Sequence, residues 1–225
     1  MCISVIIPAL DEEAQIAAAV ASAHASGVRE VIVVDGGSSD ATVRIAERHA
    51  DVVLSASRGR AVQMNAGARA ARGNVLLFLH ADTRLPRGFA AAVLVALGDP
   101  ATVGGRFDVR LVPATPLLRL VEVLMNARSR LTRIATGDQA LFVRRTVFEE
   151  LGGFAAVPLM EDVAFSRALK RRGRIACLHE CVDTSARRWL KDGPVRTILR
   201  MWWLRLLFSC GVPPERLQRY YADTR

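Results

Sequence analysis

The sequence predicts an α/β fold built on a mostly parallel sheet flanked by helices. In the first hundred residues, continuous apolar runs typical of strands buried on both faces alternate with segments of helical periodicity. The links between them are short, which favours right-handed crossovers within one sheet. Of the 225 residues, 51% are hydrophobic and 24% are charged, which is ordinary for a chain that buries a core and excludes a disordered protein.

Strands and helices are expected to alternate in the first half of the chain. The expected strands share a continuous apolar character and cover residues 3–8, 29–37, 50–56 and 75–79. The expected helices share small apolar residues at helical spacing and cover residues 12–26, a segment from about 39, and 59–73. This order predicts a Rossmann-like half of the kind that binds nucleotides.

The second half is expected to continue the same domain. Its predicted strands cover 102–112, 139–145 and 174–182, and its predicted helices cover 116–132 and 161–173. No repeat and no low-complexity linker separates the halves, so one domain is expected over 1–190, divided at about residue 100 into 1–100 and 101–190. Residues 191–225 are expected to form an amphipathic helical tail.

The basic charge of the chain is concentrated at the C-terminus. The net charge of +9 comes almost entirely from arginine, since Lys170 and Lys191 are the only lysines. From residue 184 onward, eight Arg and one Lys face three acidic residues, a surplus of +6. Codon composition explains an arginine bias as well as function does, so we predict no nucleic-acid partner.

Cysteine spacing and hydropathy predict a cytoplasmic protein with reduced thiols. Cys177 and Cys181 flank His179, but a zinc site takes four ligands with tighter pairing, so a structural role is favoured. The first apolar run is too short for a signal peptide. Arg200 and Arg205 interrupt the last apolar stretch, and a bilayer span takes about 20 apolar residues.

Acidic side chains follow two of the predicted strands. Asp35 ends the second strand and leads into "GGSSD", where it can accept hydrogen bonds from a ribose or a base; capping of the next helix is the alternative. His80 and Asp82 follow the fourth strand and point the same way, about 6.6 Å apart in extended chain. One Asp suffices for a divalent ion that carries a diphosphate. His80 fits a direct contact with metal or ribose as well as a supporting hydrogen bond.

A third acidic site is the pair Glu161 and Asp162, at the start of a predicted helix. Carboxylates near a helix N-terminus are stabilised as anions, so capping is the simpler interpretation of this pair and catalysis is the alternative.

The ordered motifs resemble family 2 glycosyltransferases of the GT-A fold. The matching segments are "SVIIPALDEE", "VIVVDGGSSDAT", "GRAVQMNAGARAARGNVLLFLHADTRLP", "TGDQALFVRRTVFEELGGF" and "MEDVAFSRALKRRGRI". They span about residues 3–190, and the version around "LLFLHADT" is most similar to the arsenosugar-biosynthesis or radical-SAM/selenodomain-associated branch. The resemblance makes 101–190 the acceptor and catalytic half.

The resemblance implies a role for each candidate residue. Asp82 would bind the metal as the second acid of a D-x-D motif, and His80 stands where the family has the first. Asp162 would be the general base, with Glu161 beside it. The residues implied at the nucleotide are Pro8, Leu10, Glu12, Asp35 and Arg60.

One further motif departs from the processive members of the family. Their Gln-x-x-Arg-Trp motif appears here only as "SARRW", with Ser185 at the Gln position. We therefore expect a non-processive enzyme, in which Arg188 and Trp189 close over the diphosphate or the acceptor.

The sequence of the C-terminal helix suits two kinds of partner, a lipid surface or a protein surface. Trp202 and Trp203 lie among leucines and arginines, a composition that suits an interfacial helix on anionic lipid at the inner membrane face. Packing against the domain or against a second copy in a homodimer is favoured, because a helix that is apolar on most of its surface is usually buried.

Together these observations predict a metal-dependent, inverting, non-processive transferase. Its cofactor would be Mn²⁺ or Mg²⁺, its donor a nucleoside-diphosphate sugar, and its acceptor a small-molecule or lipid-linked hydroxyl. One alternative is a sugar-nucleotide nucleotidyltransferase, although the acidic "ALDEE" after the first strand suits a triphosphate poorly. The other alternative is a non-catalytic nucleotide- or membrane-binding scaffold.

Overall fold

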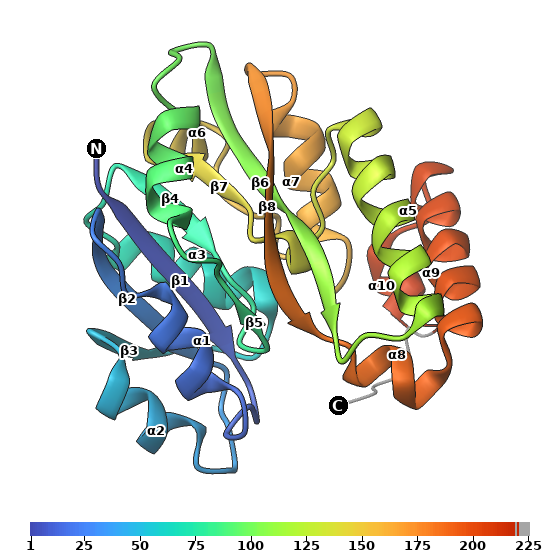
Figure 1. Cartoon of the computed structure of the whole chain (residues 1–225), viewed down its shortest axis with the longest axis horizontal. Helices are drawn as coiled ribbons and strands as arrows, with labels where there is room; N and C mark the ends of the chain where they lie inside the picture. Colours follow the sequence, from blue (N-terminus) through green and yellow to red (C-terminus); the bar gives the residue numbers. More distant parts are fainter. Residues whose placement is uncertain (219, 221–225) are drawn as a thin grey trace.

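The computed structural model describes residues 1–218 and 220 and confirms the α/β fold (Figure 1). Within this part, eight strands form one sheet in the order β3-β2-β1-β4-β7-β6-β8-β5. The strands are β1 (Ile3–Ala9), β2 (Val28–Asp35), β3 (Val52–Ser55), β4 (Val75–Phe78), β5 (Thr83–Arg84), β6 (Thr102–Val112), β7 (Phe142–Arg144) and β8 (Arg174–Ser185). The helices are α1 (Ile16–Ala23), α2 (Thr42–His49), α3 (Arg60–Ala70), α4 (Phe89–Ala96), α5 (Pro116–Thr132), the 3₁₀ turn η1 (Gly137–Gln139), α6 (Arg145–Glu150), α7 (Glu161–Leu169), α8 (Arg187–Asp192), α9 (Pro194–Ser209) and α10 (Pro214–Gln218).

The sheet is mixed rather than purely parallel. The strands β1 to β4 pair in parallel, as the short crossovers predict. However, β7 runs antiparallel to both β4 and β6, and β5 runs antiparallel to β8. The antiparallel pairs at the centre of the sheet arise because β7 lies between β4 and β6. This strand has only three residues, and so short a segment has no sequence pattern from which its direction could be predicted.

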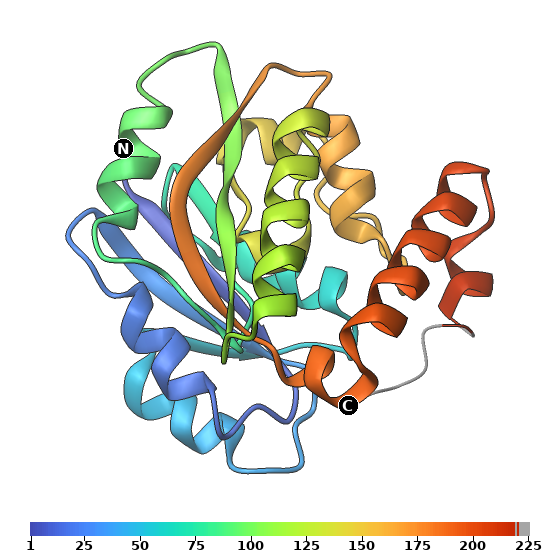
Figure 2. The same cartoon turned by 45° about the vertical axis from the view of Figure 1, so that its right-hand side comes forward.

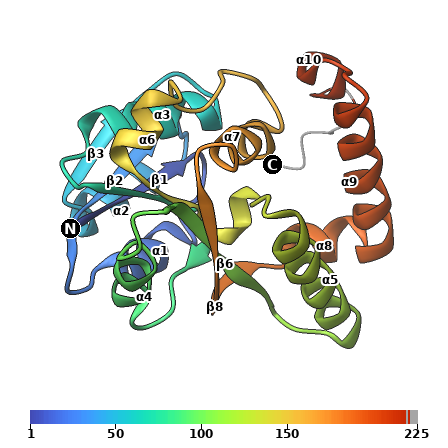
Figure 3. The ribbon, with the colours of Figure 1, turned by 90° about the horizontal axis from the view of Figure 1, so that it is seen from above.

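Two helical layers cover the sheet because successive side chains of a strand point to opposite faces. Val5 and Ile7 of β1 pack with α1, α2 and α4, whereas Ile6 packs with α3, α6 and α7. Figure 3 shows α1 and α4 on one side of the sheet and α3 and α6 on the other. At Gly67 of α3 an added Cβ would lie 2.5 Å from Ile6 Cγ2, so the glycine lets this helix approach β1 closely.

On the flank formed by the second half lie α5, α8, α9 and α10 (Figures 1 and 2). The longest, α5, begins at Thr115, whose hydroxyl oxygen accepts a hydrogen bond from Leu118 N at 3.2 Å. The helix α8 crosses the predicted boundary at residue 190, and α9 lies in the predicted tail. Among residues 1–218 and 220, no helix has both the length and the apolar character needed to cross a bilayer.

Candidate active site

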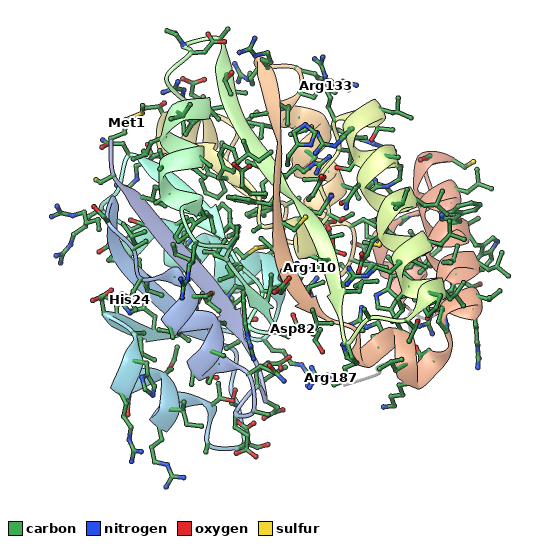
Figure 4. All side chains as sticks on the ribbon, viewed as in Figure 1. Met1, His24, Asp82, Arg110, Arg133 and Arg187 are labelled. Carbon is green, nitrogen blue, oxygen red and sulfur yellow. The ribbon has the colours of Figure 1, made fainter. Side chains whose placement is uncertain are left out.

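Several predicted site residues meet at one edge of the sheet. Because β1, β2 and β4 are parallel, their carboxyl ends lie together, with Ala9 beside Asp35 and Ile6 beside Phe78. His80 follows β4 directly. Asp82 is half-buried, and its carbonyl oxygen accepts a hydrogen bond from Ser185 N at 3.1 Å. Figure 4 shows Asp82 and Arg187 toward the end of the molecule at which β1, β6 and β8 finish.

A pocket beside this edge joins Arg60, His80, Glu161 and Asp162. Gly137 of η1 lies between His80 and Asp162 and contacts both residues. A Cβ at this position would lie 2.4 Å from His80 Nε2, so only a glycine lets η1 pack on the imidazole. The backbone N–H of Gly137 donates to Asp162 Oδ2 at 2.7 Å. His80, which comes after β4, and the two acids at the start of α7 therefore line one pocket, whereas Asp35 and Asp82 do not line it.

The two acidic residues of this pocket differ in environment. Asp162 Oδ1 also accepts a hydrogen bond from Val163 N at 2.7 Å, and the helix N-terminus stabilises the carboxylate. Glu161 is only 4% exposed and lies 3.6 Å from Arg60. Burial and the nearby Asp162 raise the pKa of Glu161, while Arg60 acts in the opposite direction. The pair therefore offers one hydrogen-bonded carboxylate and one carboxyl group that resists ionisation.

This raised pKa predicts a pH-dependent effect of Glu161→Gln. The folded protein holds a proton that the unfolded chain releases above about pH 4.5, so the stability that Glu161 contributes falls as the pH rises toward its folded pKa. The variant lacks this titration. Relative to the native protein, it should gain unfolding free energy between pH 4.5 and pH 7, measured by urea denaturation. The exposed Glu47→Gln should show no such trend, and an equal trend in both variants would contradict the raised pKa.

Asp35 holds the turn that follows β2. Its Oδ2 accepts hydrogen bonds from Gly37 N at 2.9 Å and Ser38 N at 3.1 Å, and its Oδ1 accepts one from the Ser38 hydroxyl at 2.5 Å. The side chain is only 4% exposed. These bonds close the turn at Gly37 and Ser38, whereas α2 begins at Thr42 without a side-chain cap, so Asp35 does not cap that helix. Contact of Asp35 with a base or ribose stays a prediction.

The loop after β1 is bonded to the loop after β2. Asp11 Oδ1 accepts a hydrogen bond from Ser39 N at 2.8 Å, and Asp11 N donates to Ser38 Oγ at 2.9 Å. Glu13 continues the contact by accepting from Ala41 N at 3.0 Å. Asp11 and Glu13 of "ALDEE" thus use their carboxylates to bind the neighbouring loop.

Gln63 joins the ends of both strands to α3. Its Nε2 donates to the carbonyl oxygens of Ala9 and Val34, both at 2.8 Å, and the side chain is 3% exposed. The sequence analysis missed this residue, because a Gln on a helix is usually solvated.

Replacing Gln63 by Leu should destabilise the protein by about 1–3 kcal/mol, because two carbonyl oxygens lose their donor in a buried place. Urea denaturation measures the loss. Arg69→Leu, an exposed change on the same helix, should stay within about 0.5 kcal/mol of the native protein. Equal effects of the two changes would show that the Gln63 bonds contribute nothing to stability.

Comparison with known proteins decides the family. The model of "Glycosyl transferase family 2" matches residues 4–152. The chain belongs to glycosyl transferase family 2. A comparison with curated proteins gave no match.

Solved structures show the GT-A fold of this family. The crystal structure of S. aureus TarS 1–349 superposes with a TM-score of 0.67 at 17% identity, over 92% of this chain and 66% of that one. Glucosyl-3-phosphoglycerate synthase from Mycobacterium tuberculosis, in complex with Mn²⁺, UDP and glucosyl-3-phosphoglycerate, gives 0.66 at 23% identity over 94% and 81%. The mannosyltransferase PcManGT from Pyrobaculum calidifontis, in complex with GDP-Man and Mn²⁺, gives 0.64 at 24% identity over 80% and 56%. The chain thus spans less than two thirds of some relatives.

In the "SARRW" segment of this family 2 domain, Trp189 is half-buried and packs against a small apolar cluster of Leu111, Leu118 and Val121. Closure of Arg188 and Trp189 over the diphosphate or the acceptor stays a prediction. Arg187, not singled out in the sequence, reaches the loop after β1 and lies 3.2 Å from a carboxylate oxygen of Glu12. Arg188 is half-buried on α8.

The donor set at Asp82 suits a hard divalent ion. No three His, Cys, Asp or Glu side chains gather into a metal-binding cluster in the described part of the chain. Asp82 accepts one side-chain hydrogen bond there, from Thr83 Oγ1 at 3.4 Å, which leaves carboxylate lone pairs available. A single carboxylate fits an ion that takes its other ligands from phosphate and water.

Proposed function

We propose that this family 2 domain is a metal-dependent, inverting, non-processive glycosyltransferase. It moves a sugar from a nucleoside-diphosphate sugar to an acceptor hydroxyl. The observation that supports this function best is the pocket in which Asp162, Glu161 and Arg60 meet His80, which lies just beyond the carboxyl end of β4.

The donor is assigned to the edge formed by β1, β2 and β4. Pro8 and Leu10 flank the last residue of β1, and Asp35 ends β2, so these residues would line the base and ribose. Glu12 lies beside them and is oriented by Arg187. The bonded loops after β1 and β2 would hold this surface in shape before the nucleotide arrives, which lowers the entropy cost of binding.

Asp82 would hold Mn²⁺ or Mg²⁺, with His80 beside it at the position of the first acid of the motif. The bound ion would neutralise the charge that develops on the departing nucleoside diphosphate. Arg60 is 31% exposed and lines the same pocket, so its guanidinium can reach the donor.

Asp162 would act as general base and take the proton of the acceptor hydroxyl. Direct attack of that oxygen on the anomeric carbon, with departure of the diphosphate from the opposite side, inverts the configuration. The hydrogen bonds from Gly137 N and Val163 N fix the carboxylate in place. Burial raises the pKa of Glu161, and its carboxyl group lies 3.6 Å from Arg60, so we assign the role of base to Asp162 rather than to Glu161.

A thermal-shift panel of nucleoside diphosphates, each with and without Mn²⁺ or Mg²⁺, tests the function. A ligand at 100 times its dissociation constant stabilises a protein by about 2.7 kcal/mol. The transferase predicts a metal-dependent shift with one base. A preference for a triphosphate would favour the nucleotidyltransferase, and the absence of any shift would favour the scaffold.

The exposed face of α9 is assigned to an anionic membrane surface. Leu199, Trp202 and Trp203 are 61%, 60% and 45% exposed, and Arg196 beside them is also exposed. Packing against the domain involves Leu204, which lies on another side of the helix and is fully buried. Exposed tryptophans beside arginines suit the interface of an anionic bilayer.

Co-sedimentation with phosphatidylglycerol vesicles should therefore exceed that with phosphatidylcholine vesicles, and Trp202→Ser should reduce it. A stable dimer in light scattering that leaves no vesicle binding would instead assign this face to a second copy. This proposal places the enzyme in the cytoplasm, at the inner membrane face. Separately, the segment around "LLFLHADT" supports the proposal that the chain belongs to the arsenosugar-biosynthesis or radical-SAM/selenodomain-associated branch.

A further inference from the structure

Two arginines near Asp162 have no part in the proposed donor site. Arg128 belongs to α5 and Arg205 to α9, two helices that pack together. The Nε and Nη2 atoms of Arg128 and the Nε atom of Arg205 are buried, and among the described residues they have no hydrogen-bond acceptor. Both side chains keep partial exposure, so the pair remains open to a ligand.

Neighbouring arginines on the same helices are paired. Arg130, also on α5, lies 2.5 Å from Asp108, and Arg200, also on α9, lies 2.5 Å from Asp192. No such ion pair is formed by Arg128 or Arg205 in the part of the chain described here. The elements beside α5 and α9 thus supply counterions to Arg130 and Arg200, through Asp108 of β6 and Asp192 of α8.

The charge state of Arg128 reflects this lack of a counterion. Burial and the nearby Arg205 lower its pKa to about 10, and Asp138 and Asp162 act in the opposite direction. The guanidinium therefore stays charged at neutral pH. A buried charge without an acceptor is costly, because it has lost water and gained no partner. An anion between the two guanidinium groups would remove that cost.

We infer that Arg128 and Arg205 bind a phosphate group of the acceptor, an inference that rests on the proposed function. The planar guanidinium matches phosphate oxygens with two parallel hydrogen bonds. Asp138 Oδ1 is buried without a donor and lies close enough to act on Arg128, so it can accept a hydrogen bond from a hydroxyl of the same ligand. The site therefore suits a phosphate ester that also carries hydroxyl groups.

The location separates this site from the donor diphosphate. Neither arginine lines the pocket that joins Arg60, His80 and Asp162. Both act from the helical flank of the second half, whereas Asp82 lies at the edge of the sheet. Because Asp162 is near Arg128, a phosphate held there would bring the rest of the acceptor toward the proposed base.

Calorimetric titration with glycerol 3-phosphate tests the site without nucleotide or turnover. Arg205→Met keeps the side-chain volume and removes the charge. It should weaken binding at least about tenfold, the loss expected from one charge-assisted hydrogen bond. Arg171→Met, an exposed change outside α5 and α9, should leave the affinity unchanged. Without phosphate, Arg205→Met should keep or raise the melting temperature, because it removes an unpaired cation.

Other results would overturn the inference. Failure of the native protein to bind either glycerol 3-phosphate or vesicles that contain phosphatidic acid would do so, as would equal binding of both probes by the native protein and Arg205→Met. A similar loss of nucleoside-diphosphate binding in Arg205→Met would assign the pair to the donor instead. A failed nucleotide panel beside intact phosphate binding would remove the proposed function alone.

A second binding experiment, with phosphatidylcholine vesicles that contain phosphatidic acid, distinguishes a lipid phosphate from the phosphate of a soluble acceptor. Binding that depends on Arg205 with these vesicles but not with glycerol 3-phosphate would identify a lipid phosphate. Dependence with glycerol 3-phosphate alone would identify a soluble acceptor.

Discussion

Asp162→Asn should lower the turnover of sugar transfer by about 10²–10⁴-fold, the usual contribution of a positioned general base. The amide cannot take the proton of the acceptor hydroxyl. It retains one acceptor oxygen, so one of the two hydrogen bonds from Gly137 N and Val163 N can persist and the helix start is preserved. Steady-state kinetics with the donor found in the nucleotide panel measures the effect.

Donor binding is the control for this change. The nucleoside-diphosphate thermal shift of Asp162→Asn should equal that of the native protein, since the carboxylate is assigned to the acceptor and not to the nucleotide. Turnover that survives unchanged would remove Asp162 from the role of base and return it to helix capping.

Asp82→Ala should abolish the metal-dependent part of nucleotide binding. With the only proposed protein ligand gone, the ion loses its anchor, and the stabilisation of about 2.7 kcal/mol at 100 times the dissociation constant should shrink to the metal-free value. The measurement is the melting temperature with nucleoside diphosphate, with and without Mn²⁺.

Asp183→Ala provides a matched loss of negative charge on the neighbouring strand. Asp183 pairs across the sheet with Arg84, two residues beyond Asp82, and its carboxylate binds Arg110 at 2.5 Å. This variant should keep the metal-dependent shift. If both variants lose it equally, the effect is one of general electrostatics, and Asp82 is no metal ligand.

Long periodic segments made much of the fold predictable. The strand 102–112 and the helix 116–132 occur where their patterns predict them, because β6 is buried on both faces along most of its length and α5 buries one side. The helix expected from residue 12 begins instead at Ile16. The reason is tertiary, since the backbone N–H groups of Glu12 and Glu13 donate to Thr42 and Asp40 rather than to a helical turn.

Contacts between distant short segments could not be predicted in the same way. The direction of β7 depends on pairing with two strands that lie far away in sequence. Around the site, Asp162 and His80 were placed together through family motifs, whereas the bond from Gly137 that connects them has no pattern of its own. Arg128 looked like an ordinary charge on an amphipathic helix, and only burial distinguishes it.

The apolar contacts of α9 and α10 have a practical consequence. Leu204 and Leu217 pack with Met160 and Val163, the residues that border Glu161 and Asp162 on either side. A shortened protein that stops at residue 190 would expose those two neighbours to water and loosen the start of α7. Removal of the C-terminal helices would therefore loosen the support of Asp162, the proposed base.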